Sequence, residues 1–154
     1  MSAYAGPLDS CVILPTLRLV GRQRRQAILS RSSLKPVVQA LDPDQEAPGL
    51  PGWKCIPTPG HTPGHMSLFR TSVRVLITGD AVVTIELNSL WGFLRHRNGL
   101  SGPPWYTTWN RSAARESIAM LATLEPTVLA SGHGHPQIGE GTSRTLRDFA
   151  ERVG

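Results

Sequence analysis

Thr58-Pro-Gly-His-Thr-Pro-Gly-His65 is the stretch on which the interpretation of this sequence depends. Its two histidines are four residues apart, a spacing that would place both on one face of a helix. Pro63 and Gly64 lie between them, and a proline inside a helix costs roughly 3 kcal/mol. We therefore predict a rigid loop between short strands at 53–57 and 66–71, which can hold an imidazole in a fixed direction. Taken alone, the same loop could be a surface turn with two exposed histidines.

In two later segments, an apolar run is followed by a residue that can bind a metal. The run 73–78 stops at Gly79-Asp80, and the run 127–130 stops at Ser131-Gly-His-Gly-His135. Three predicted strand ends thus deliver a histidine, an aspartate and a histidine. Nitrogen and oxygen ligands of this kind suit zinc or a similar divalent ion.

These segments together resemble a known family. The stretch 58–65, Ile77-Thr-Gly-Asp80 and Ser131-Gly-His-Gly134 are similar to the second half of the metallo-β-lactamase-fold hydrolases, the superfamily of glyoxalase II. The similarity runs from about Pro48 to Gly139. It implies an α/β (α+β) fold that is half of an αββα sandwich, with a mixed sheet and helices on one face. We expect this half-domain at 48–154, preceded by an N-terminal arm at 1–47.

The resemblance also implies roles for individual residues. His61 matches a ligand of a first metal ion, and Asp80 matches the catalytic carboxylate that bridges two ions. His133 matches a ligand of the second ion, although His135 could be the ligand in its place. His65 and His135 would otherwise support the ligands without binding metal. The implied cofactor is Zn²⁺, with up to two ions in a completed site.

One part of the family pattern is absent from this chain. The signature His-x-His-x-Asp-His belongs upstream of the histidine loop, but no histidine precedes His61. His133-Gly-His135 has the spacing of the first half of this signature, but Gln137 and Ile138 stand where its Asp-His should be. Each ion would keep two protein ligands, whereas catalytic zinc generally has three and a water molecule. We therefore expect a truncated chain whose metal binding is weak or absent in isolation.

Three functions remain open from the sequence. The first is a zinc-dependent hydrolase that attacks an ester, thioester or lactone of a small-molecule substrate. The second is a non-catalytic remnant or binding module with weak metal affinity. The third is a nuclease of the same superfamily, suggested by 16 Lys and Arg against 11 Asp and Glu. Nucleic acid is the less favoured partner, because no basic run alternates with aromatic residues as in single-strand binders.

The remaining predictions concern local structure and surroundings. We expect a helix at 112–124 capped by Asn110 or Ser112, and a last helix from Thr142 or Ser143. A long loop, 88–110, precedes the first of these helices, and its aromatic residues could line a substrate pocket: Trp91, Trp105 and Tyr106. The half-sandwich would leave one apolar sheet face uncovered, which invites a homodimer or the missing N-terminal half. No signal peptide or membrane span is evident, so a cytoplasmic location is expected.

Overall fold

The computed structural model describes residue 41 and residues 46–86 and 98–154. The expected arm at 1–47 lies almost wholly outside these ranges, so it stays a prediction. The described elements are β1 (Lys54–Pro57), β2 (Met66–Arg70), the 3₁₀ turn η3 (Thr71–Val73), β3 (Val75–Ile77), β4 (Val83–Ile85), β5 (Asn98–Ser101), α4 (Arg111–Ala122), β6 (Val128–Ala130), β7 (Gln137–Ile138) and α5 (Gly141–Val153).

The larger sheet is mixed and has five strands, in the order β1-β2-β3-β6-β7. β2 pairs antiparallel with β1 and β3, whereas β3 pairs parallel with β6, with Leu76 opposite Leu129. The Thr78 amide extends this pairing beyond β3 by donating to the Ala130 carbonyl at 2.8 Å. Because parallel strands end at the same edge of a sheet, the loops after β3 and β6 lie side by side. These are the loops that carry Asp80 and His133.

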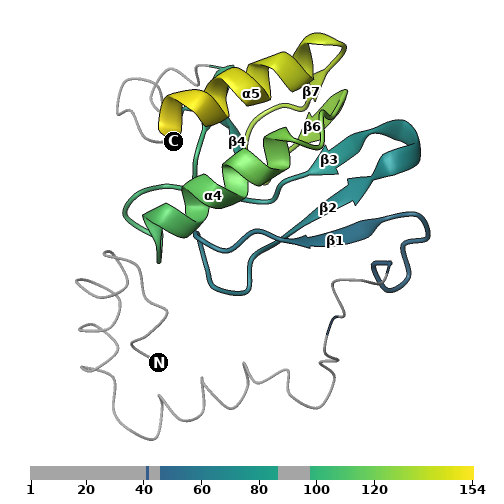
Figure 1. Ribbon diagram of the computed structural model, residues 1–154, viewed down its shortest axis with the longest axis horizontal. Coiled ribbons are helices and arrows are strands. Elements are labelled where there is room, and N and C mark those ends of the chain that lie inside the picture. Colours follow the sequence, from purple (N-terminus) through teal and green to yellow (C-terminus); the bar gives the residue numbers. More distant parts are fainter. Residues whose placement is uncertain (1–40, 42–45, 87–97) are drawn as a thin grey trace, which may run out of the picture.

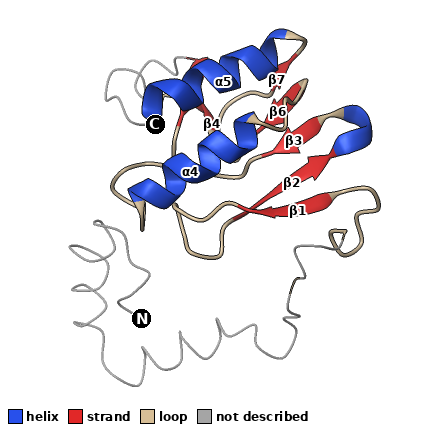
Figure 2. Ribbon diagram, viewed as in Figure 1, coloured by secondary structure: helices blue, strands red, loops and turns tan. Residues whose placement is uncertain are grey.

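Both helices pack on one face of this sheet (Figure 1; Figure 2). The core between helices and sheet contains side chains that are fully buried: Leu76 and Leu129 from the strands, Leu121 from α4 and Leu146 from α5. Burying such side chains stabilises the fold by roughly 1.5–3 kcal/mol each. The expected fold class, an α+β arrangement with a mixed sheet and helices on one face, is confirmed.

The first helix begins where the sequence predicts a cap. Asn110 has extended backbone angles, and its side chain accepts a hydrogen bond from the Ala113 amide at 3.1 Å. This satisfies one of the amides that a helix start leaves unpaired. The helix ends before Glu125, which has a positive φ of 48°, and Pro126. Among the described residues, no helix is long and apolar enough to cross a membrane.

The sheet face opposite the helices is apolar. Strand register places Leu68, Ile77 and Ala130 in one row across this face, and Val128 and Ile138 in the next. Ile77 is 37% exposed and Ile138 is 78% exposed. The expected partner for this face, a homodimer or the missing N-terminal half, stays a prediction.

Two short strands were missed by the sequence analysis. β5 lies inside the segment 88–110 that was predicted to be a loop, and it pairs with β4 in a separate two-stranded sheet. Asn98-Gly99 has low strand propensity, so only the long-range pairing makes it a strand. β7 contains just two residues and is formed by pairing with β6.

Candidate metal centre

Asp80 lies between the two histidines that the sequence predicts as ligands. Its Oδ2 atom is 3.7 Å from His61 Nε2, and its Oδ1 atom is 3.5 Å from His133 Nε2. Each carboxylate oxygen therefore faces a different imidazole. The structure brings together three residues from three loops, each following or preceding a strand of the same sheet.

The spacing of these atoms suits metal ligands better than direct hydrogen bonds. A protein hydrogen bond joins its heavy atoms at about 2.7–3.2 Å, which is shorter than either distance here. Two ligands on one tetrahedral zinc, each about 2.1 Å from the ion, are about 3.4 Å apart. The number of ligands does not reach that of a complete site, because the described residues contain no group of three or more His, Cys, Asp or Glu that could hold one ion. The described residues therefore supply only part of the ligands that a metal centre needs.

The histidine loop is held by the N-terminal end of α4. The amides of Trp109 and Asn110 donate to the carbonyls of His61 and Gly60 at 3.2 and 3.0 Å, and Ser117 Oγ donates to the Pro59 carbonyl at 2.7 Å. Gly60 has a φ of +143°, and a Cβ atom there would collide with the backbone of Ala114. The glycine thus permits the close packing that fixes the direction of the His61 side chain.

The second nitrogen of His61 has no partner in the described part of the chain. His61 Nδ1 is buried and makes no hydrogen bond there. A metal-bound imidazole usually donates its other N–H to an oxygen acceptor. His65 was one candidate for supporting His61, but its ring stands edge-on to His61 with the ring centres 6.3 Å apart.

His65 instead contacts the backbone of Asp80. The Asp80 amide donates to His65 Nε2 at 3.1 Å, and His65 Nδ1 is 2.8 Å from Thr58 Oγ1. Burial lowers the pKa of His65 below its usual value, and the neighbouring His61 lowers it further. A lowered pKa favours the neutral ring, which can accept a hydrogen bond from an amide.

The loop of His133 is fixed by hydroxyl groups that the sequence analysis did not identify. The His133 carbonyl accepts from Ser131 Oγ at 2.6 Å, and from the amide and the hydroxyl of Thr84 at 3.1 Å each. Thr84 also forms a parallel bridge with Gly134. Thr84 is 49 residues from His133 along the chain, so no local sequence signal could have found this contact.

The other predicted site residues are less closely tied to Asp80. His135 is exposed and takes no part in the pairs around Asp80. Trp91 lies outside the described residues. Trp105 is 54% exposed and makes an edge-to-face contact with Tyr106, with ring centres 5.8 Å apart. Trp105 also lines a small cavity of about 150 Å³ beside Arg111.

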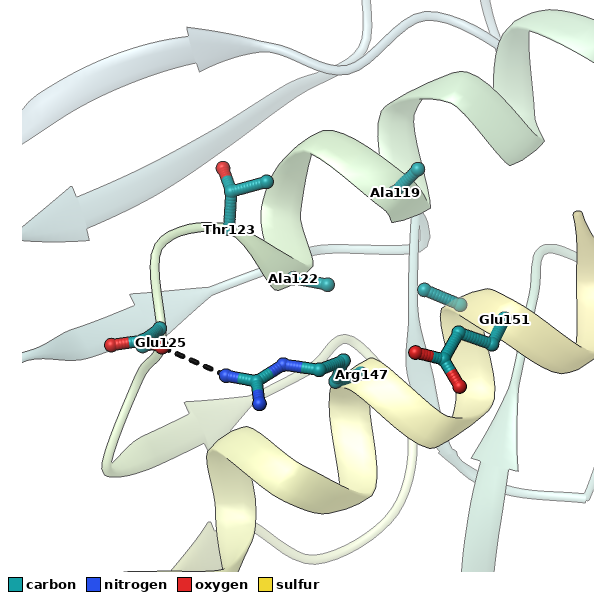
Figure 3. A pocket seen from close by; sticks show the side chains of 7 residues that line it. Ala119, Ala122, Thr123, Glu125, Arg147 and Glu151 are labelled. Carbon is teal, nitrogen blue, oxygen red and sulfur yellow. Dashed lines mark hydrogen bonds and ion pairs between the residues drawn. The ribbon is translucent and has the colours of Figure 1, made fainter.

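A larger cavity lies between the helices, away from the predicted ligands. It has a volume of about 500 Å³, and its lining includes Ala119, Ala122 and Ala150. Figure 3 shows Arg147 reaching across this cavity to Glu125, with its Nη2 atom 2.7 Å from Oε1. None of the predicted ligands lines it, so the pocket with the greater volume is not the candidate metal centre.

Comparison with known families decides which group of proteins the chain belongs to. The family model described as "Metallo-beta-lactamase superfamily" matches residues 6–133. The chain belongs to the metallo-beta-lactamase superfamily. The match confirms the resemblance inferred from the histidine loop, Asp80 and His133.

Two curated relatives come from Bacillus subtilis (strain 168). The chain is 47% identical over 116 residues to the "Probable metallo-hydrolase YflN", a match that covers 75% of this chain and 44% of that protein. It is 39% identical over 84 residues to the "Uncharacterized protein YobT", covering 51% of this chain and 33% of the relative. The chain therefore spans less than half the length of these two curated relatives.

Two solved structures are also similar to the chain. A metallo-beta-lactamase family protein from Thermus thermophilus, TTHA1429, is 27% identical with a TM-score of 0.43, covering 66% of this chain and 28% of that one. The protein TTHA1623, solved in a di-iron-bound form, is 22% identical with a TM-score of 0.45, covering 73% of this chain and 48% of that one.

Proposed function

We propose that this chain carries part of the metal centre of a zinc-dependent hydrolase. The observation that supports this most is the position of Asp80, whose two oxygens each face one histidine at 3.7 and 3.5 Å. Asp80 would bridge two ions and set their separation, while His61 and His133 would each bind one. Two divalent ions, when bound, lower the pKa of a shared water and polarise the substrate's carbonyl oxygen.

The substrate class follows from this chemistry. A small-molecule ester, thioester or lactone has the carbonyl group that such a centre attacks. The segment that carries Trp105 and Tyr106 leads directly to Trp109, whose amide is bonded to the His61 carbonyl. This attachment supports the proposal that aromatic side chains from the segment border the substrate, next to the ligand loop.

The small number of ligands favours a second function, that of a metal-binding module without catalytic activity. Each ion would have two ligands among the described residues, and catalytic zinc generally needs three. A chain with this shortage would bind zinc weakly and act as a binding module without turnover. No specific observation favours the nuclease alternative.

Zinc titration of the full chain tests both candidates. Isothermal titration calorimetry of the unmodified chain should show weak zinc binding that Asp80→Ala abolishes. Asp148→Ala is the matched control, because Asp148 is an exposed aspartate on α5. Absence of zinc binding in the unmodified chain would refute the proposal of a metal centre.

Turnover then separates the two functions. A chromogenic p-nitrophenyl ester is supplied in excess zinc to the unmodified chain and to both variants. Hydrolysis that Asp80→Ala removes and Asp148→Ala keeps would support the hydrolase. Zinc binding without hydrolysis would favour the binding module.

A further inference from the structure

A series of hydrogen bonds begins and ends on the turn that carries Asp80. From the Asp80 amide it passes to His65 Nε2 at 3.1 Å, and from His65 Nδ1 to Thr58 Oγ1 at 2.8 Å. It continues to Ser67 Oγ at 3.0 Å and returns to the Thr78 carbonyl at 3.3 Å. Thr78 is two residues before Asp80, so three side chains close a ring on one strand end.

The proton positions in this ring can be deduced from its Asp80 end. A backbone amide can only donate, so His65 Nε2 must be the acceptor and carry no proton. In a neutral imidazole the other nitrogen then carries it. His65 Nδ1–H therefore donates to the Thr58 hydroxyl.

The same assignment follows independently from the other end. A backbone carbonyl can only accept, so the single hydroxyl proton of Ser67 points to Thr78. Thr58 must then donate its own proton to Ser67, and it can only accept from His65. Both deductions place the proton on His65 Nδ1, and each of the three side chains has one donor and one acceptor satisfied within the ring.

Burial and close packing make this arrangement costly to change. Thr58 and Ser67 are each 1% exposed and Thr78 is fully buried, so water does not readily replace a lost partner. Gly79 has a φ of +53°, and a Cβ atom there would be 2.8 Å from His65 Nε2. The ring of His65 thus lies directly against the turn that presents the Asp80 carboxylate.

We propose that His65 is a positioning residue: as a neutral imidazole protonated on Nδ1, it holds the Asp80 amide and thereby keeps the Asp80 carboxylate between His61 and His133. Its influence on metal binding rests on the proposed metal centre, whereas its tautomer does not. His65 would contribute no metal ligand of its own.

The tautomer is measured first, on the full metal-free chain. Long-range ¹H–¹⁵N NMR spectra distinguish protonated from unprotonated ring nitrogens, and the signals of His65 are assigned by their loss in His65→Ala. We expect Nδ1 protonated and Nε2 unprotonated at neutral pH. A ring protonated on Nε2 would overturn the proposal, whether or not the chain binds metal.

Two conservative variants then separate positioning from general support of the fold. A glutamine side chain places its oxygen where Nε2 lies and can accept from the Asp80 amide, whereas asparagine reaches only the Nδ1 position. We expect His65→Asn to weaken zinc binding on the order of 10- to 100-fold, and His65→Gln to recover most of that loss. Thr62→Ala is the control, because Thr62 is an exposed residue of the same loop.

Each outcome of the zinc titration has a defined meaning. Equal losses in His65→Gln and His65→Asn would overturn the positioning role, and so would unchanged affinity in both. If the unmodified chain binds no zinc, the proposed metal centre fails and His65 has no ligand to position. Should the variants fail to fold, the tautomer in the unmodified chain still decides the proposal.

Discussion

Gly132 lies directly against the carboxylate of Asp80. A Cβ atom built on Gly132 would be 2.5 Å from Asp80 Oδ1. The Gly132 amide also donates to the Gly79 carbonyl at 2.8 Å, which joins the loop of His133 to the loop of Asp80. With the two backbones joined, the carboxylate is the group that moves when a side chain is added at Gly132.

Gly132→Ala is therefore expected to impair metal binding more than stability. The added methyl group pushes the flexible carboxylate away from His133, and zinc affinity should fall on the order of 10- to 100-fold. The free energy of unfolding should change by less than about 1 kcal/mol. Calorimetric zinc titration and urea unfolding measure the two effects. Gly141→Ala is the control, since no atom lies within 4 Å of its added Cβ; unchanged zinc affinity in a folded Gly132→Ala variant would contradict the site.

Gly134→Ala should instead destabilise the fold. A Cβ atom there would be 2.8 Å from the backbone carbon of Thr84, which cannot move without disturbing β4. Gly139 also has a positive φ, but its added Cβ would meet nothing within 4 Å. The difference in unfolding free energy between the two alanine variants thus isolates the close contact, and we expect about 1–3 kcal/mol. Equal unfolding free energies would show that the contact with Thr84 is unimportant.

The titration of His65 should lie on the acid side of an ordinary histidine. Burial lowers its pKa below the usual value of 6.5. Because the pKa of His65 is lower in the folded than in the unfolded state, its contribution to the stability of the fold is fully present above about pH 6.5. It is lost as the pH falls through the folded-state pKa. NMR titration of the ring carbons in the metal-free chain checks this, and a midpoint at or above 6.5 would contradict it.

The apolar sheet face opposite the helices gives a prediction about association. Ile77 and Ile138 are exposed on the face opposite the helices, and we predict that two copies of the chain pair through it. Sedimentation velocity should show a dimer that Ile138→Lys converts to monomer. Val73→Lys is the control, because Val73 is also exposed but lies in the turn η3. An unmodified chain that is monomeric at all concentrations would refute the pairing.

The sequence could predict those site residues that directly follow a strand. An apolar run that stops at Gly79-Asp80, and another that stops before His133, place both residues just beyond buried strands. Pairing of such strands brings their ends together, and the family resemblance added that Asp80 would share metal ions with His61 and His133. The Asn110 cap was predictable for the same reason, because capping depends on residues within one turn.

The supporting contacts could not be predicted because they join residues far apart in sequence. Thr84 and His133 are 49 positions apart, and Thr84 carries no motif that marks it. The same holds for β5, whose Asn98-Gly99 start favours a turn until β4 pairs with it. His65 was expected to support a ligand, but its contact with the Asp80 amide depends on a φ of +53° at Gly79.

The position of bound zinc tests the central claim most directly. Crystals of the full chain soaked in zinc are measured at the zinc absorption edge, and the anomalous difference map locates the ions. We predict density between Asp80 and His61 and between Asp80 and His133. Zinc bound elsewhere, with nothing at Asp80, would contradict the assignment of this carboxylate as the bridging ligand.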